Sequence, residues 1–417
     1  MRRTMVILFV VSILLAACRA EKQPGTPTAS PAAAGEPYNV GAVAAITGPV
    51  ASTYAPFTEG FRLYIRHLNA RGGINGHPVN LVVKDSQANP SVAGALAKEL
   101  FESNNALTVV MLGPSSNILP VLEQAKPLGA AVLSSTGCID QQAPPDPDPL
   151  LFCTPLLAGG IGSHLAPVVE YIAQQGGPGA KVFLSALDIP ASRAIVDDAT
   201  KRLQGKGLEA RMVVVPNPPP ADLGPIARQG IDFGAQWGTG GAPEEATLAL
   251  FQALLRQGWR GTWVGDPPLG YDDILERFKS DQLIISFGVY PLAERKPFHA
   301  ELEAAAREFG SAFPVPRLMY GWALGVMVES ALRQCGWPCD RAKFQQAMNN
   351  LEVDYGASGI WPAGAKLKFT PTDHIGQRYQ RLYKWDSASN RIVPVGPWYR
   401  VEHTGKREVS VTVVSQQ

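Results

Sequence analysis

Short hydrophobic runs alternate with amphipathic segments along most of the chain after residue 37. The runs at residues 39–46 and 108–112 carry almost no polar side chains, as expected of parallel strands that are buried on both faces. After the first run, Phe61, Tyr64 and Leu68 recur at the spacing of one helix face. The pattern therefore predicts repeated strand–helix units, which assemble into parallel sheets covered by helices.

Two series of these units follow each other, and a chain of 417 residues exceeds one ordinary core. We therefore expect an α/β protein with two doubly wound parallel-sheet lobes. Strands are predicted at residues 39–46, 79–85, 108–112 and 130–133, and again at 181–187, 211–216, 231–237 and 261–266. Helices are predicted at residues 90–101, 116–128, 163–175, 190–204, 244–257, 271–279, 297–309, 317–334 and 340–350.

Small hydroxyl side chains follow two of the predicted strands. Ser115 and Ser116 come after one strand, and Ser134, Ser135 and Thr136 come at the end of the next. Because parallel strands end at the same edge of a sheet, these groups should line a crevice beside helix N-termini. Such a crevice suits a carboxylate. The alternative is that the serines only cap helices.

The N-terminus has the layout of an export signal. Two arginines precede a hydrophobic core at residues 5–15, which is shorter than the roughly 20 residues that span a bilayer. The sequence LAAC at residues 15–18 resembles the bacterial lipobox, which implies that a signal peptide of residues 1–17 is removed and Cys18 is lipidated. A plain signal peptide or a buried helix is the alternative. Residues 18–37 are rich in Pro, Ala, Ser and Thr and should form a flexible linker.

Four further cysteines form two local pairs, Cys138 with Cys153 and Cys335 with Cys339. Export permits disulfides, and a bridge around the Pro-rich loop at 138–153 should contribute about 3 kcal/mol. Four reduced, buried thiols are the alternative. Zinc is not expected, because the second pair has the wrong spacing and no histidine is near.

Composition and motifs argue against several functional classes. The net charge is +1 and the Lys and Arg residues are scattered, which does not favour binding of nucleic acid. The chain has no GxSxG, GxxxxGK[ST] or HExxH motif, and its six histidines are spread out. We therefore expect no enzymatic activity, cofactor or metal. We also expect a monomer.

Several segments resemble the branched-chain amino acid type of periplasmic solute-binding protein. They are ITGPVAS at 46–52, NARGGINGHPVNLVVKD at 69–85, GPSSN at 113–117 and AVLSS at 131–135. Members of this family have two α/β lobes joined by a three-crossover hinge, close on a small solute, and deliver it to the permease of an ABC transporter. The resemblance thus implies a lipid-anchored extracytoplasmic protein that binds an amino acid, an amide or a related carboxylate. A sensor that reports its ligand to a membrane receptor is the alternative.

The same resemblance implies the domain boundaries. Lobe 1 is expected at residues 38–154 and 290–352, and lobe 2 at residues 155–289 and 353–417. It also implies first-lobe ligand contacts, in which the GPSSN serines hold a carboxylate and a tyrosine of a late helix faces the cleft. These contacts are Thr53, Tyr54, Ser115, Ser116, Ser134, Ser135, Thr136 and Tyr320.

The second lobe departs from the family pattern. Asp188-Ile189-Pro190-Ala191 stands where the family often has an acidic residue followed by Tyr and Gly. For the acidic residue that grips an α-ammonium group, the candidate is Asp266 at a predicted strand end, with Trp237 as a neighbour in the cleft. Asp266 can equally be a turn residue before two prolines.

Overall fold

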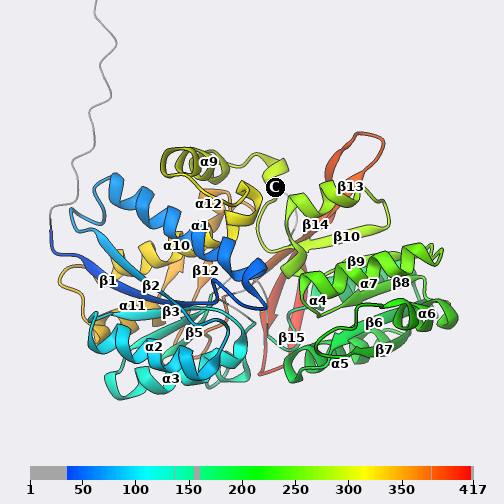
Figure 1. Cartoon of the computed structure of the whole chain (residues 1–417), viewed down its shortest axis with the longest axis horizontal. Coiled ribbons are helices and arrows are strands. Elements are labelled where there is room, and N and C mark those ends of the chain that lie inside the picture. The colour runs from blue at the N-terminus through cyan, green and yellow to red at the C-terminus, as the bar shows by residue number, and fades with distance from the viewer. Residues whose placement is uncertain (1–34, 136, 155–159, 377, 415–417) are drawn as a thin grey trace, which may run out of the picture.

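The first lobe is built on a five-stranded parallel sheet. The computed structural model describes residues 35–135, 137–154, 160–376 and 378–414, and Figure 1 shows two lobes side by side. The first sheet has the strand order β2-β1-β3-β4-β5, with every pair parallel. Its strands are β1 (Tyr38–Ala44), β2 (Val79–Asp85), β3 (Thr108–Leu112), β4 (Ala131–Ser134) and β5 (Leu151–Cys153).

Helices from two distant parts of the sequence belong to this lobe. Those from the N-terminal part are α1 (Ala51–Ala70), α2 (Pro90–Glu102) and α3 (Ile118–Ala125). Those added later are α9 (Pro297–Phe309), α10 (Val315–Cys335), α11 (Arg341–Asn349) and α12 (Tyr355–Ser358), together with the short strands β11 (Glu352–Val353) and β12 (Leu367–Lys368). The three late helices predicted from the sequence therefore pack on the first lobe.

The second lobe contains an eight-stranded sheet of order β15-β14-β13-β10-β9-β8-β6-β7. The parallel part is β6 (Lys181–Leu187), β7 (Glu209–Val215), β8 (Trp237–Gly240), β9 (Thr262–Gly265) and β10 (Leu283–Phe287). The antiparallel part is β13 (Tyr379–Asp386), β14 (Arg391–His403) and β15 (Val409–Val414). The helices are α4 (Ala166–Gly176), α5 (Pro190–Gly205), α6 (Gly224–Phe233), α7 (Glu244–Arg256) and α8 (Asp272–Phe278).

One predicted strand is wrong. Residues 231–237 were expected to form a strand, but α6 continues through Phe233 and buries Ile226, Ala227 and Gly230 on one face. Gly234, at φ 77°, ends that helix in a conformation that favours glycine. The strand β8 therefore begins only at Trp237. Trp237 lies at the amino end of this strand, whereas the sequence prediction placed it at a carboxyl end.

The chain passes between the lobes three times, after β5, after β10 and before β13. The backbone N–H of Cys153 donates to the carbonyl of His374, and Ile375 forms a bridge to Cys153. Residues 374–375 thus lie against the first sheet. We propose that the third crossover follows Ile375, whereas the sequence-based division places it at residue 352. The other boundaries stay predictions.

A close helix crossing fixes the position of α10. A Cβ atom at Gly60 of α1 would lie 2.1 Å from the carbonyl oxygen of Leu318. One at Gly321 of α10 would lie 2.0 Å from the carbonyl oxygen of Phe57. Only glycine permits this approach, which seats the first turn of α10 firmly beside α1.

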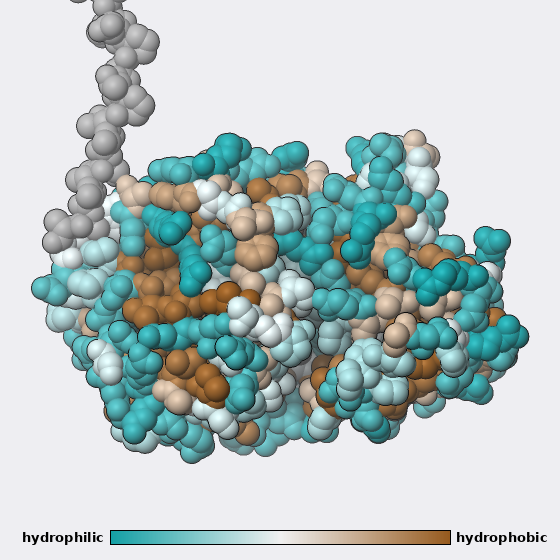
Figure 2. All heavy atoms as spheres, viewed as in Figure 1, coloured by the Kyte–Doolittle hydropathy of each residue, from teal (hydrophilic) through white to brown (hydrophobic). Residues whose placement is uncertain are grey.

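The visible face of the molecule is mainly hydrophilic, with hydrophobic patches over the first lobe (Figure 2). Exposed apolar side chains of the first lobe include Val92 on α2 and Leu119 on α3. Within the ranges described above, no helix is both long and apolar enough to cross a bilayer. In the same ranges, no cluster of His, Cys, Asp and Glu side chains forms a candidate metal site.

A buried histidine on β14 predicts acid sensitivity. Burial, with a smaller effect of Arg378, lowers the pKa of His403 to about 4, whereas an unfolded histidine titrates near 6.5. Between these pH values only the unfolded chain takes up the proton, so stability falls as pH falls. When the pH falls from 7 to 5, the free energy of unfolding decreases in both proteins. We expect this decrease to be about 2 kcal/mol smaller for His403→Phe than for the wild type.

Urea denaturation of both proteins at the two pH values measures this difference. Burial also lowers the pKa of His299, to about 4, so the variant should keep part of the acid sensitivity. An equal pH dependence in the two proteins would contradict the prediction for His403.

Candidate functional site

The carboxyl ends of the parallel strands of the two lobes face each other. A cavity of about 250 Å³ lies between them, contacted by Ser115 and Ile139 from the first lobe and by Ala191 and Ile195 of α5 from the second. Ile161 adds to the apolar part of the lining, and Asp140 and Gln141 add polar groups. The cavity is therefore the candidate ligand site, and residues after β3 and after β6 position its walls.

Ser115 is the hydroxyl that the structure brings to this cavity. It begins a 3-10 turn after β3, and its hydroxyl has no hydrogen bond with the described part of the chain. Ser116 is exposed and its hydroxyl makes only a long contact of 3.5 Å with Asn117 Oδ1. Ser115 is therefore placed to donate to a ligand.

The serines at the end of β4 have internal partners. The Ser135 hydroxyl donates to the carbonyl of Met111 at 2.7 Å, which ties β4 to β3. The Ser134 hydroxyl accepts from Gln142 Nε2 at 2.7 Å. Both residues are buried, so these bonds indicate a structural role inside the first lobe, which is neither ligand contact nor the helix capping considered as the alternative. Thr136 lies outside the described residues.

The first turn of α1 faces the second lobe. The Ser52 hydroxyl hydrogen-bonds to Glu245 at the start of α7. Thr53 and Tyr54 follow directly and are half-buried. Both residues thus lie beside the junction between the lobes, but neither lines the 250 Å³ cavity, and their contact with a ligand stays a prediction.

Asp266 follows β9 at the carboxyl edge of the second sheet. Its side chain is buried, and Oδ2 lies 2.8 Å from Nε2 of His164. Oδ1 has no hydrogen-bond partner in the described part of the chain. Leaving such an oxygen unpaired costs about 1–3 kcal/mol or more. Asp266 does not line the 250 Å³ cavity.

A second unpaired polar atom lies at the opposing edge. Thr154 directly follows β5 and is buried, and its Oγ1 has no partner among the residues described. Sequence reasoning missed Thr154, although a hydroxyl directly after a buried strand is the signal that identified Ser134.

Tyr320 links α10 to the second lobe. Its hydroxyl accepts from the backbone N–H of Gly288 at 3.2 Å and lies 3.5 Å from the carbonyl oxygen of Pro267. Burial raises the pKa of Tyr320, so the hydroxyl keeps its proton and can donate. The residue is fully buried and contacts both lobes instead of facing an open cleft.

Trp237 lies away from the cleft, in contrast to the sequence prediction. It is the first residue of β8, pairs with Val182 and Thr262, and stands against the ring of Tyr171. Trp237 lies at the amino end of β8, whereas Asp266 follows the carboxyl end of β9. The two residues are therefore at opposite ends of the parallel strands.

A cluster of one arginine and two carboxylates joins the two lobes, and the sequence analysis did not predict it. Arg317, in the first turn of α10, makes two hydrogen bonds to Glu244 of α7, at 2.6 and 3.0 Å. It makes two more to Asp273 of α8, at 2.7 and 3.0 Å. Although burial opposes it, these two carboxylates raise the pKa of Arg317. The guanidinium also lies 4.4 Å from the ring centre of Tyr271.

The sequence matches the family model described as periplasmic binding protein over residues 37–390. A comparison with curated protein sequences gives no match. Among solved structures, one similar chain is a branched chain amino acid ABC transporter from Thermus thermophilus with bound valine. It is 20% identical with a TM-score of 0.74, and the match covers 88% of this chain and 97% of that one.

Two further solved structures have the same fold. One is the solute binding protein of an ABC transporter from Rhodopseudomonas palustris BisB5 in complex with 3,4-dihydroxy benzoic acid, at 19% identity, TM-score 0.71, and 88% and 99% coverage. The other is a fatty acid ABC transporter substrate-binding protein from Thermomonospora curvata, at 16% identity, TM-score 0.68, and 87% and 92% coverage. The predicted α/β fold with two lobes is confirmed.

Proposed function

This chain belongs to the periplasmic binding protein family, and we propose that it is the extracytoplasmic solute-binding component of an ABC importer. The observation that carries this function is the cavity between the two carboxyl edges, which both lobes contact. The family and the similar structures are transport proteins, so no catalytic role is needed to explain the cleft. The partners would be a small solute and the permease subunits, with the binding protein acting as a monomer.

We further propose that the solute carries an anionic or acceptor group and a cationic or donor group. Ser115 lines the cavity and can donate to the first. Asp266 does not line the cavity, so its unpaired Oδ1 accepts from the second only when the solute extends beyond the cavity toward the end of β9. The apolar cavity walls at Ile139, Ile161 and Ile195 suit a short aliphatic body. At about 250 Å³ the cavity is smaller than common drug-sized pockets, which fits a molecule of amino-acid size.

Calorimetric titration tests this assignment with amino acids, their amides, and the matching carboxylates that lack an amine. We expect amino acids to bind most tightly, because they alone meet both anchors as ions. Binding confined to carboxylates without an amine would contradict the role of Asp266.

We also propose two disulfides. The structure pairs Cys138 with Cys153 and Cys335 with Cys339, with Cα–Cα distances of 5.4 and 5.6 Å that suit a bridge. Mass mapping of the unreduced protein should give these two local links. Four free thiols, or links between the two pairs, would contradict the prediction.

Lipid anchoring at Cys18 remains a proposal that rests on the sequence, because residues 1–34 lie outside the described residues. Several acyl chains together hold a protein stably at a membrane, at about 0.8 kcal/mol per buried methylene. Cys18→Ser should therefore yield a soluble or unprocessed form in membrane fractionation. If this variant still partitions as a processed lipoprotein, the lipobox assignment is wrong.

A further inference from the structure

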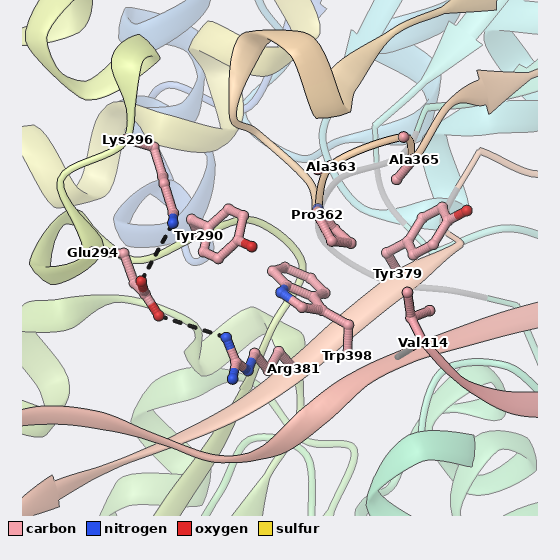
Figure 3. A pocket seen from close by; sticks show the side chains of 11 residues that line it. Tyr290, Glu294, Lys296, Pro362, Ala363, Ala365, Tyr379, Arg381, Trp398 and Val414 are labelled. Atoms are coloured by element: carbon pink, nitrogen blue, oxygen red, sulfur yellow. Dashed lines mark ion pairs between the residues drawn. The ribbon is translucent and has the colours of Figure 1, made fainter. Parts of the chain in front are cut away.

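A second cavity, of about 760 Å³, lies on the hinge side of the molecule. It is enclosed by the crossover segment after β10, the loop at residues 362–365, and strands β13 and β14 (Figure 3). None of its lining residues lines the cleft cavity. The proposed importer function does not account for it.

An indole N–H without a partner contributes to the wall of this cavity. Trp398 is 1% exposed, and its Nε1 has no hydrogen-bond partner in the described residues. Figure 3 shows the indole nitrogen turned toward the side of Glu294 and Arg381. A buried donor of this kind is stabilised when an acceptor enters.

Among the described residues that line this cavity, the charged side chains are Lys296, Arg381 and Glu294. Lys296 Nζ lies 3.5 Å from Glu294, and Arg381 Nη1 lies 3.6 Å from the same carboxylate. Both distances are longer than the 2.7–2.9 Å of strong charge-assisted hydrogen bonds. Arg381 also donates to the carbonyl of Gly396 at 2.9 Å, so Lys296 is the cation with capacity for a further anion.

Aromatic rings form the remaining walls. Tyr290 meets Trp398 edge to face, with ring centres 4.9 Å apart, and Lys296 Nζ lies 4.2 Å from the centre of the Tyr290 ring. Tyr379 stands on the other side of the indole (Figure 3). Such walls favour a flat apolar body over an extended polar one.

We propose that this hinge-side cavity binds an organic anion with a flat apolar body, of the aromatic carboxylate class, at a site separate from that of the solute in the cleft. Its carboxylate accepts from Trp398 Nε1 and pairs with Lys296, and its ring contacts Tyr290 and Tyr379. The loop at 362–365 belongs to a segment tied to α10, since the Tyr355 hydroxyl donates to the Ala323 carbonyl at 2.7 Å, whereas β13 and β14 belong to the second lobe. An occupant therefore contacts both lobes, and its affinity should depend on the hinge angle.

Benzoate is the probe, with acetate as the control that lacks the ring. Calorimetry on the full chain should show benzoate binding that Lys296→Gln and Trp398→Phe each weaken by about tenfold, the effect of losing one charged or buried hydrogen bond. Ser115→Ala, in the cleft, should leave it unchanged. Acetate should bind far more weakly, because it cannot contact the aromatic walls.

A second readout locates the probe directly. In a ¹⁵N spectrum of the indole N–H groups, benzoate should shift the resonance that disappears in Trp398→Phe. Benzoate that fails to bind at millimolar concentration, or that binds both hinge-side variants as tightly as it binds the wild type, would overturn the proposal. So would binding that only Ser115→Ala weakens, because it would place the anion in the cleft.

Discussion

Replacing Arg317 with methionine should weaken solute binding by about 10- to 100-fold, because this residue holds the two lobes together in the closed form. Arg317 lies on α10 of the first lobe, whereas its partners Glu244 and Asp273 lie on α7 and α8 of the second. The substitution would leave two neighbouring carboxylates without their cation in the closed form only. In an open form all three groups can be hydrated, so the penalty falls on closure.

The size of the effect follows from burial. Removing one partner from a fully buried ion pair costs about 3–5 kcal/mol. Arg317 is 13% exposed but Asp273 is 36% exposed, so solvent screening reduces the penalty. We expect about 1.4–3 kcal/mol, which corresponds to one to two decades of affinity.

The matched control is Arg228→Met. Arg228 pairs with Asp232 on the exposed surface of α6, away from the junction, and such pairs contribute little. Adding Glu244→Gln to Arg317→Met should restore part of the affinity, because it removes one of the two unpaired carboxylates. Equal affinities for Arg317→Met and Arg228→Met would show that the cluster does not control closure.

Asp266→Asn should reduce affinity for ammonium-bearing solutes by about 10- to 100-fold and leave carboxylates without an amine nearly unaffected. The asparagine keeps the shape of the side chain but removes the charge, and a hydrogen bond to a charged group contributes about 1.5–3 kcal/mol. Calorimetry with an amino acid and its amine-free analogue measures the two effects.

Ser115→Ala provides the comparison for this prediction. It should weaken both solutes by roughly tenfold, because both present the carboxylate that Ser115 contacts. Asp266→Asn could instead weaken the binding of both solutes by the same factor, as expected for Ser115→Ala. Asp266 would then support the fold through His164 and would not contact the ligand.

Much of the fold follows from local patterns in the sequence. The hydrophobic runs at 108–112 and 181–187 coincide with β3 and β6, because strands buried on both faces need continuous apolar sequence. The strand predicted at 231–237 failed because a short apolar stripe also fits one face of a helix. The antiparallel strands β13–β15 were missed because none of them is a continuous apolar run. Gln380 and Arg381 interrupt β13, and β15 keeps most of its side chains partly exposed.

The candidate site was only partly accessible from the sequence. Ser115 follows a recognisable strand, so its place at the carboxyl edge could be predicted from topology. Whether a serine faces a ligand or the protein could not be predicted, since Ser115 and Ser135 both follow predicted strands, and only the fold shows that Ser135 is buried and donates to Met111 on the neighbouring strand. The partners of Arg317 lie 44 and 73 positions away from it in the sequence, and no local pattern reveals such contacts.

The central claim is that a solute in the cleft stabilises the closed arrangement of the two lobes. Closure requires that the ligand interact more strongly with the closed form than with the open one, which means contacts with both lobes. Small-angle scattering on the full chain, with and without a saturating amino acid identified by calorimetry, tests this most directly. We expect the radius of gyration of the wild type to decrease on saturation. The decrease should be larger for Arg317→Met, because this variant starts from a more open form. Saturable binding in the cleft with no change in the scattering of either protein would contradict the account.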